Sequence, residues 1–96
     1  MLIISDKAVV SRLADIEDST RGTRITIDDG AHIDSFVKIK PAGGLGDVHI
    51  GKNTYINSGV VIYTGNGLTI GNNVLIAANC TFAPVNHAFK DRSVKI

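Results

Sequence analysis

The sequence predicts an all-β solenoid made of short strands and sharp corners. An aliphatic residue recurs every six positions, and an apolar or small residue stands two positions before most of these anchors. Alternate residues of a strand point to the same face, so both members of each pair would lie inside the solenoid. A period of six does not match the 3.6 residues of a helical turn, and the 10 glycines favour turns over helices.

The repeats fall into four groups of three. The anchors are Ile4, Val10 and Ile16, then Ile27, Ile33 and Ile39, then Ile50, Ile56 and Ile62, and finally Ile70, Ile76 and Phe82. The residues two positions before the anchors are apolar or small: Ala8, Ala14, Ile25, Ala31, Val37, Val48, Thr54, Val60, Leu68, Val74 and Cys80. The residues directly after anchors include the turn-tolerant Asp28, Asp34, Gly51, Asn57 and Gly71. Three strands with three corners would make one triangular coil.

The spacing of the groups places the loops. The first anchors stand at residues 4, 27, 50 and 70, so the coils advance by 23, 23 and 20 residues, against 18 for three plain hexads. The excess always follows the third hexad, in "EDSTRGTR", "KPAGGLGDV", "YTGNG" and the closing segment 83–96. We therefore expect one β-helix domain over residues 1–96, with about four triangular coils and all loops at one edge, where function is usually carried.

Composition narrows the function classes. A chain of 96 residues with 44% hydrophobic residues suits one small globular domain. A net charge of +1 argues against binding nucleic acid by bulk charge. A single cysteine excludes an internal disulfide framework and favours a cytoplasmic location. The apolar run after Met1 is too short for a signal peptide or a membrane span.

The main candidate for a catalytic residue lies in the fourth loop. Asn86 stands where a small inward residue should be, and His87 follows it. His87 is either a solvated loop side chain or a general base, because imidazole titrates near neutral pH. Three histidines can also hold zinc, but the repeat assigns His32 and His49 to different corners of the coil. Cys80 fills an inward slot, which indicates a structural thiol rather than a nucleophile.

Basic residues recur in or beside the loops. They are Arg21, Arg24, Lys40, Lys90, Arg92 and Lys95. They form either ordinary solvated surface or a mildly basic rim for an anionic ligand such as a phosphorylated cofactor. The glycines of "GGLG" and "GNG" are better explained as loop residues than as phosphate loops, because no helical pattern follows them.

The hexads "IGKNTY", "INSGVV" and "IGNNVL", joined to "IAANCTFAPVNHAF", resemble the hexapeptide-repeat acyltransferases. The resemblance is strongest to the sugar O-acetyltransferases of the maltose, galactoside and polysaccharide type. It implies a left-handed parallel β-helix, acetyl-CoA as co-substrate, a homotrimer with active sites between subunits, and no metal. His87 takes the place of the catalytic base in that family.

The resemblance also implies partners for His87. It would remove a proton from a sugar hydroxyl, which attacks the acetyl-CoA thioester directly. Asn57 and Asn86 are the candidate substrate-binding residues, Asn57 by its place in the coil before His87 and Asn86 by its position beside the base; turn chemistry is the alternative for both. The residues that bind the coenzyme are expected mostly beyond Ile96, because family members continue with further coils. The chain would then be an N-terminal portion of a longer enzyme.

Other functions remain open at this point. An amine acceptor on a nucleotide-linked sugar is a close variant. A trimeric metalloenzyme of the γ-carbonic-anhydrase type would use the same solenoid, and its zinc content would separate it from an acetyltransferase. A non-catalytic solenoid could serve as an assembly module.

Overall fold

The computed structural model describes residues 1–18, 23–41 and 46–82, and in these the chain forms three parallel β-sheets. The first sheet contains β1 (Leu2–Ile4), β4 (Ile25–Ile27), β7 (Val48–Ile50) and β10 (Leu68–Ile70). The second contains β2 (Val9–Val10), β5 (His32–Ile33), β8 (Tyr55–Ile56) and β11 (Leu75–Ile76). The third contains β3 (Asp15–Ile16), β6 (Lys38–Lys40), β9 (Val61–Tyr63) and β12 (Thr81–Phe82).

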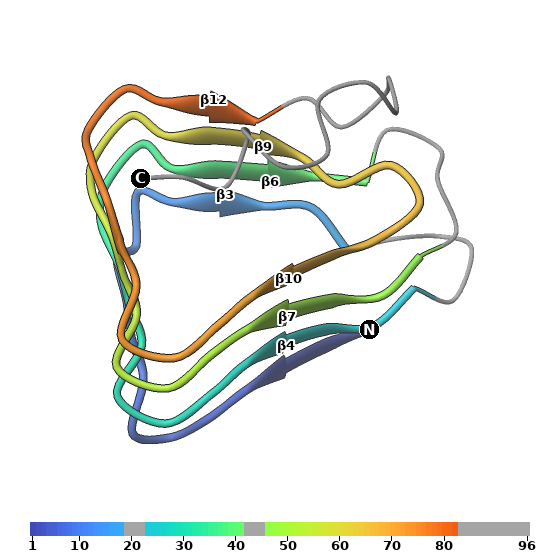
Figure 1. Cartoon of the computed structure of the whole chain (residues 1–96), viewed down its shortest axis with the longest axis horizontal. Coiled ribbons are helices and arrows are strands. Elements are labelled where there is room, and N and C mark those ends of the chain that lie inside the picture. The colour runs from blue at the N-terminus through green and yellow to red at the C-terminus, as the bar shows by residue number, and fades with distance from the viewer. Residues whose placement is uncertain (19–22, 42–45, 83–96) are drawn as a thin grey trace.

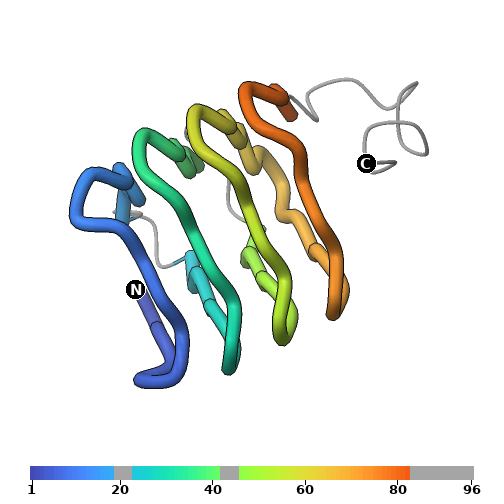
Figure 2. The backbone as a smooth tube through the Cα atoms, turned by 90° about the vertical axis from the view of Figure 1, so that its left-hand side faces the viewer, coloured from blue at the N-terminus to red at the C-terminus, as the bar shows by residue number. Residues whose placement is uncertain are grey.

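The sheets are the three sides of a triangular prism (Figure 1). Each sheet holds one strand from every coil, and the coils follow one another along the prism axis, as Figure 2 shows. The path of the chain through the two views is left-handed. The fold is thus a left-handed parallel β-helix, as the sequence resemblance implied. Among the described residues no helix is long and apolar enough to cross a membrane.

The register of the strands explains why the hexads repeat. Ile4 pairs with Ile27, and Ile27 with Ile50, which in turn pairs with Ile70, so the first anchors of all coils stack in one column. A coil that is 3 residues shorter keeps this register, because the difference falls in the loop and not in a strand. The columns of isoleucine make a core that runs along the prism axis.

The core confirms the predicted inward track in the second to fourth coils. Its fully buried members are mostly anchors: Ile27, Ile33, Ile39, Ile50, Ile56, Ile62 and Ile76 are at most 1% exposed. In the first coil Ile4 points inward as predicted but is 42% exposed. Ile4 has the same strand position as Ile27, but no coil among the described residues covers it from the other side.

The corners turn at a different residue from the one that the sequence predicted. The left-handed backbone conformation occurs three residues after the anchor, at Gly30, Phe36, Asn53, Gly59, Asn73 and Asn79. Glycine is favoured at residue 59, where φ is +75° and a Cβ atom would lie 2.1 Å from Oδ1 at the end of the Asn79 side chain. Asp28 and Asp34, directly after their anchors, instead accept hydrogen bonds from the backbone N–H of the next residue, at 2.8 and 2.7 Å.

Candidate functional site

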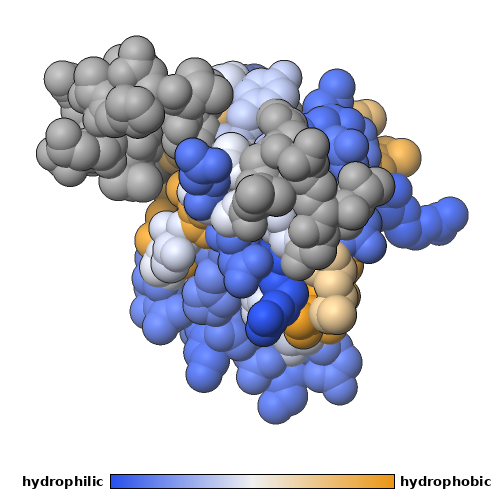
Figure 3. All heavy atoms as spheres, turned by 90° about the vertical axis from the view of Figure 1, so that its right-hand side faces the viewer, coloured by the Kyte–Doolittle hydropathy of each residue, from blue (hydrophilic) through white to orange (hydrophobic). Residues whose placement is uncertain are grey.

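All described connections between the third and first sheets lie at one edge of the prism, which we call the loop edge. Its described residues are Glu17, Asp18, Thr23, Arg24, Pro41, Gly46, Asp47, Thr64, Gly65, Asn66 and Gly67. The edge is at the right of Figure 1, and Figure 3 shows that hydrophilic residues cover most of its described surface. This agrees with the loop placement that the spacing of the anchors predicts.

The predicted base belongs to the fourth loop of this edge by its place in the sequence. β12 ends at Phe82, in register with Ile62 of β9, whose coil continues into the loop edge. His87 follows Phe82 by five residues, and both His87 and Asn86 lie outside the described residues. The structure therefore establishes the scaffold from which this loop departs.

Asn57 lies at a different edge of the prism. It follows β8 at the corner between the second and third sheets, which we call the second corner (residues 11–14, 34–37, 57–60 and 77–80). Its Nδ2 donates a hydrogen bond of 2.8 Å to the backbone oxygen of Ile76 in the next coil. Within one chain, Asn57 does not share the loop edge, and its amide links two coils.

Lys40, at the end of β6 beside the loop edge, lies near two carboxylates. Its Nζ lies 2.9 Å from Oδ2 of Asp15 and 3.8 Å from Oε1 of Glu17. The hydrogen bond to Asp15 raises the pKa of Lys40 above its ordinary value, so the ammonium stays charged and already has carboxylate partners.

The described part of the edge is therefore not the basic rim that was one of the alternatives. Arg24 is accompanied there by Asp18 and Asp47, and the carboxylate of Asp47 accepts a 3.0 Å hydrogen bond from the Arg24 backbone N–H. The remaining basic residues of the predicted rim, Arg21, Lys90, Arg92 and Lys95, lie outside the described residues.

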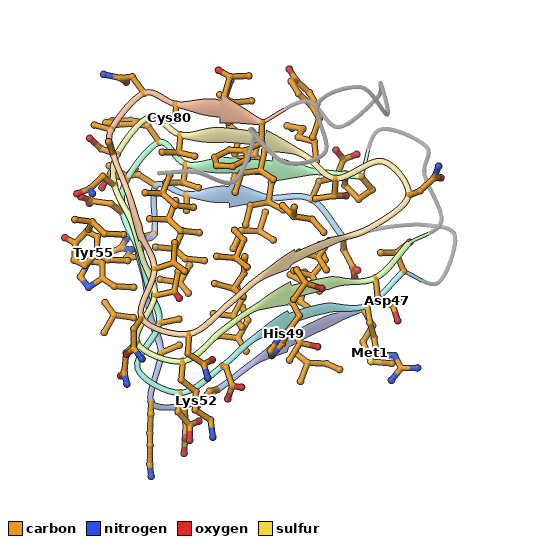
Figure 4. All side chains as sticks on the ribbon, viewed as in Figure 1. Met1, Asp47, His49, Lys52, Tyr55 and Cys80 are labelled. Carbon is orange, nitrogen blue, oxygen red and sulfur yellow. The ribbon has the colours of Figure 1, made fainter. Side chains whose placement is uncertain are left out.

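The histidines of the described coils lie on different sides of the prism. His32 is on the second sheet, stacked on Tyr55 with ring centroids 4.2 Å apart, and His49 is on the first sheet, with Nε2 3.4 Å from Oδ2 of Asp28 (Figure 4). Within residues 1–18, 23–41 and 46–82, no three or more His, Cys, Asp or Glu side chains gather into a group that could hold a metal ion. Nothing in this part of the chain favours the zinc alternative.

The lowered pKa of Asp28 was not predicted from the sequence, whereas the environment of Cys80 was. The backbone N–H of Asp29 lowers the pKa of Asp28, and the contact with His49 acts in the same direction. Cys80 is half-buried and packs against the core, as its inward slot predicts.

Two of the side-chain contacts between neighbouring coils have a signal in the sequence, which is the 23-residue advance from one coil to the next. His32 and Tyr55, like Glu17 and Lys40, are 23 residues apart, which is one coil advance. A search for chemically matched residues at that separation would have found them.

No family model, curated protein or solved structure matches the chain.

Proposed function

We propose that the protein is an acetyl-CoA-dependent O-acetyltransferase that acts on a hydroxyl group of a sugar or saccharide. One observation carries the proposal: the left-handed prism sends its described inter-coil loops to a single edge, and the segment "APVNHAF" follows β12 at the position of the next loop. A rigid solenoid with loops at one edge provides a fixed platform for a base and two substrates.

In the proposed reaction His87 acts as general base. Its imidazole takes the proton of the acceptor hydroxyl while the oxygen attacks the carbonyl carbon of the thioester. The C–S bond then breaks, the coenzyme leaves as a thiolate, and the proton that His87 holds is passed to that thiolate sulfur. No acyl-enzyme is formed, so the mechanism makes no use of the half-buried Cys80. A base of this kind contributes roughly 10²- to 10⁴-fold to the rate.

The position of Asn57 makes the homotrimer part of the proposal. Because Asn57 lies at the second corner, it would reach an acceptor beside His87 only from a neighbouring subunit. The same holds for any other second-corner residue that contacts the acceptor. Asn86, next to the base in sequence, would orient the imidazole or the acceptor from within the same chain.

The test compares two histidine variants of the full natural chain. Acetyl-CoA consumption is measured against a panel of saccharides, with product detection by mass spectrometry. His87→Ala is expected to lower turnover by at least about 100-fold, with an unchanged far-ultraviolet circular dichroism spectrum.

The matched control is His49→Ala, which removes an imidazole from the first sheet and is expected to retain activity. Equal activity of the two variants on a saccharide that the wild-type protein acetylates would reject His87 as the base. Absence of any acetylated product from the panel with the wild-type protein would reject the substrate class.

A further inference from the structure

Phe36, at the second corner, has a backbone conformation that does not suit its side chain. Its φ of +63° lies in the left-handed region, which a bulky residue adopts only with strain. In the next two coils the same position of this corner is held by Gly59 and Asn79, with φ of +75° and +64°. Both of these residue types tolerate the left-handed conformation. Phe36 therefore strains a corner that the chain builds elsewhere from suitable residues.

The aromatic ring of Phe36 is not used by the core. Phe36 is 63% exposed, whereas Phe82, at an anchor position, is 3% exposed and belongs to the core. Burial is what normally makes an aromatic side chain stabilising. A strained residue that gains no such packing points to a role outside the fold, because strain of this kind gathers at functional sites.

The surroundings of the ring are polar and almost uncharged. In the second to fourth coils the second corner contains two amides, two hydroxyls and one carboxylate. These side chains are Asn57, Asn79, Ser35, Ser58 and Asp34. The single carboxylate disfavours an anionic ligand. Serine and aspartate are depleted at the cores of protein interfaces, so a protein partner is disfavoured as well.

The position next to Phe36 along the prism carries no side chain. It is Gly59, and the oxygen of the neighbouring Ser35 accepts a hydrogen bond of 3.2 Å from its backbone N–H. Oδ1 of Asn79 lies over this glycine, where a Cβ atom would meet it. The Asn79 amide and the Ser58 hydroxyl have no hydrogen-bond partner among the described residues. An exposed ring is thus followed along the corner by available polar groups.

We propose that the second corner binds a neutral saccharide, with the Phe36 ring against one face of a sugar ring. The C–H groups on one face of a pyranose pack on an aromatic ring, and its hydroxyls exchange hydrogen bonds with serine and asparagine side chains. Neighbouring coils are about 4.8 Å apart, which is close to the width of a sugar ring. A short saccharide therefore contacts Phe36 and the polar groups of the third and fourth coils together.

The link between this site and acetyl transfer rests on the proposed function. Asn57, a candidate substrate-binding residue, belongs to the same corner one coil after Phe36. An acceptor that passes Asn57 on its way to His87 of a neighbouring subunit would also extend over Phe36. Phe36 then determines which acceptors bind well, without touching the reacting atoms.

The test measures saccharide binding to the full natural chain by isothermal titration, without acetyl-CoA. The probes are neutral saccharides that include maltose and lactose. Phe36→Asn is expected to weaken binding about three- to tenfold, as the loss of one aromatic contact does. Because this change relieves backbone strain, weaker binding does not come from a loss of folding. Phe36→Tyr keeps the ring and is expected to bind like the wild-type protein.

The matched control is Leu75→Asn, at a 62% exposed site on β11 outside the corner, and it is expected to leave binding unchanged. In acetyl transfer, Phe36→Asn is expected to raise KM for the saccharide and to keep kcat, whereas His87→Ala lowers kcat. Binding that depends on Phe36 in a protein that transfers no acetyl group would uphold this site and reject the proposed function.

Three results would overturn the proposal. The first is that the wild-type protein binds none of the saccharides, and the second is that Phe36→Asn binds them as tightly as the wild-type protein. The third is a lower mass of Phe36→Asn in sedimentation velocity, because a second copy of the chain would then cover the ring.

Discussion

The buried hydroxyl of Thr64 is expected to lower the stability of this solenoid. Thr64 follows β9 at the loop edge, is 0% exposed, and its Oγ1 has no hydrogen-bond partner in the part of the chain that the structure describes. Thr54 is equally buried, but its Oγ1 donates to the backbone oxygen of Gly71 at 2.6 Å and accepts from the N–H of Val74 at 3.2 Å. The two threonines form a matched pair.

Replacement of each threonine by valine exchanges the hydroxyl for a methyl group of similar size. An unpartnered buried hydroxyl costs about 1–3 kcal/mol, so Thr64→Val is expected to raise the free energy of unfolding by about 1–2 kcal/mol. Thr54→Val removes two hydrogen bonds between the third and fourth coils and is expected to lower it by about 1–3 kcal/mol. The two variants should therefore differ by at least about 2 kcal/mol.

Urea unfolding followed by circular dichroism measures both values. The comparison is made at one protein concentration, because any association adds to the apparent stability. Equal slopes of free energy against urea show that the variants unfold from the same folded state. If Thr64→Val destabilises the protein as much as Thr54→Val does, the Thr64 hydroxyl has a partner, such as a buried water molecule, and the reasoning is refuted.

Two further substitutions test the corners. Phe36 has a φ of +63° and is 63% exposed, whereas Asn79, two coils later in the same corner, has a φ of +64°. Phe36→Asn is expected to stabilise the fold by about 1 kcal/mol in urea unfolding, because asparagine tolerates this conformation better; a loss of stability would contradict the strain argument. The lowered pKa of Asp28 means that its contribution to stability is complete above its ordinary value of 3.8 and is lost as the pH falls through the folded-state value. Asp28→Asn should therefore reduce the melting temperature at about pH 7 and have a smaller effect at about pH 2.5; equal effects at both pH values would count against it.

Most of the fold could be predicted because each coil repeats one local rule. A strand has two faces, so the alternation of Val48, His49 and Ile50 is enough to place the valine and the isoleucine inside the solenoid and the histidine outside. The residue that makes the turn was misassigned by two positions, because asparagine, aspartate and glycine occur at several points of each corner. Their side-chain roles, such as the Asp28 carboxylate accepting the Asp29 N–H, depend on backbone geometry that composition does not reveal.

For the candidate site, the sequence predicts the edge of the prism at which it lies but not which residues share that edge. Anchor spacing places the loop of His87 at the same edge as the earlier loops, whereas the fold places Asn57 at another corner. A sequence position one coil before the base does not imply proximity to it, because a triangular coil has three edges and a residue at one of them is separated from the others by the core. The resemblance names residues, and the solenoid determines which of them share a chain or need a second subunit.

By itself the sequence determined the period of the coil, the inward and outward faces of its strands and the edge that carries the loops. These properties are local, since they follow from six-residue patterns and from the places where the patterns are interrupted. The tertiary structure alone decided that His49 meets Asp28, that Thr64 is buried without a hydrogen-bond partner among the described residues, and that Ile4 is exposed while Ile27 is not. Each of these depends on which coil lies above or below a residue, and stacking supplies that neighbour.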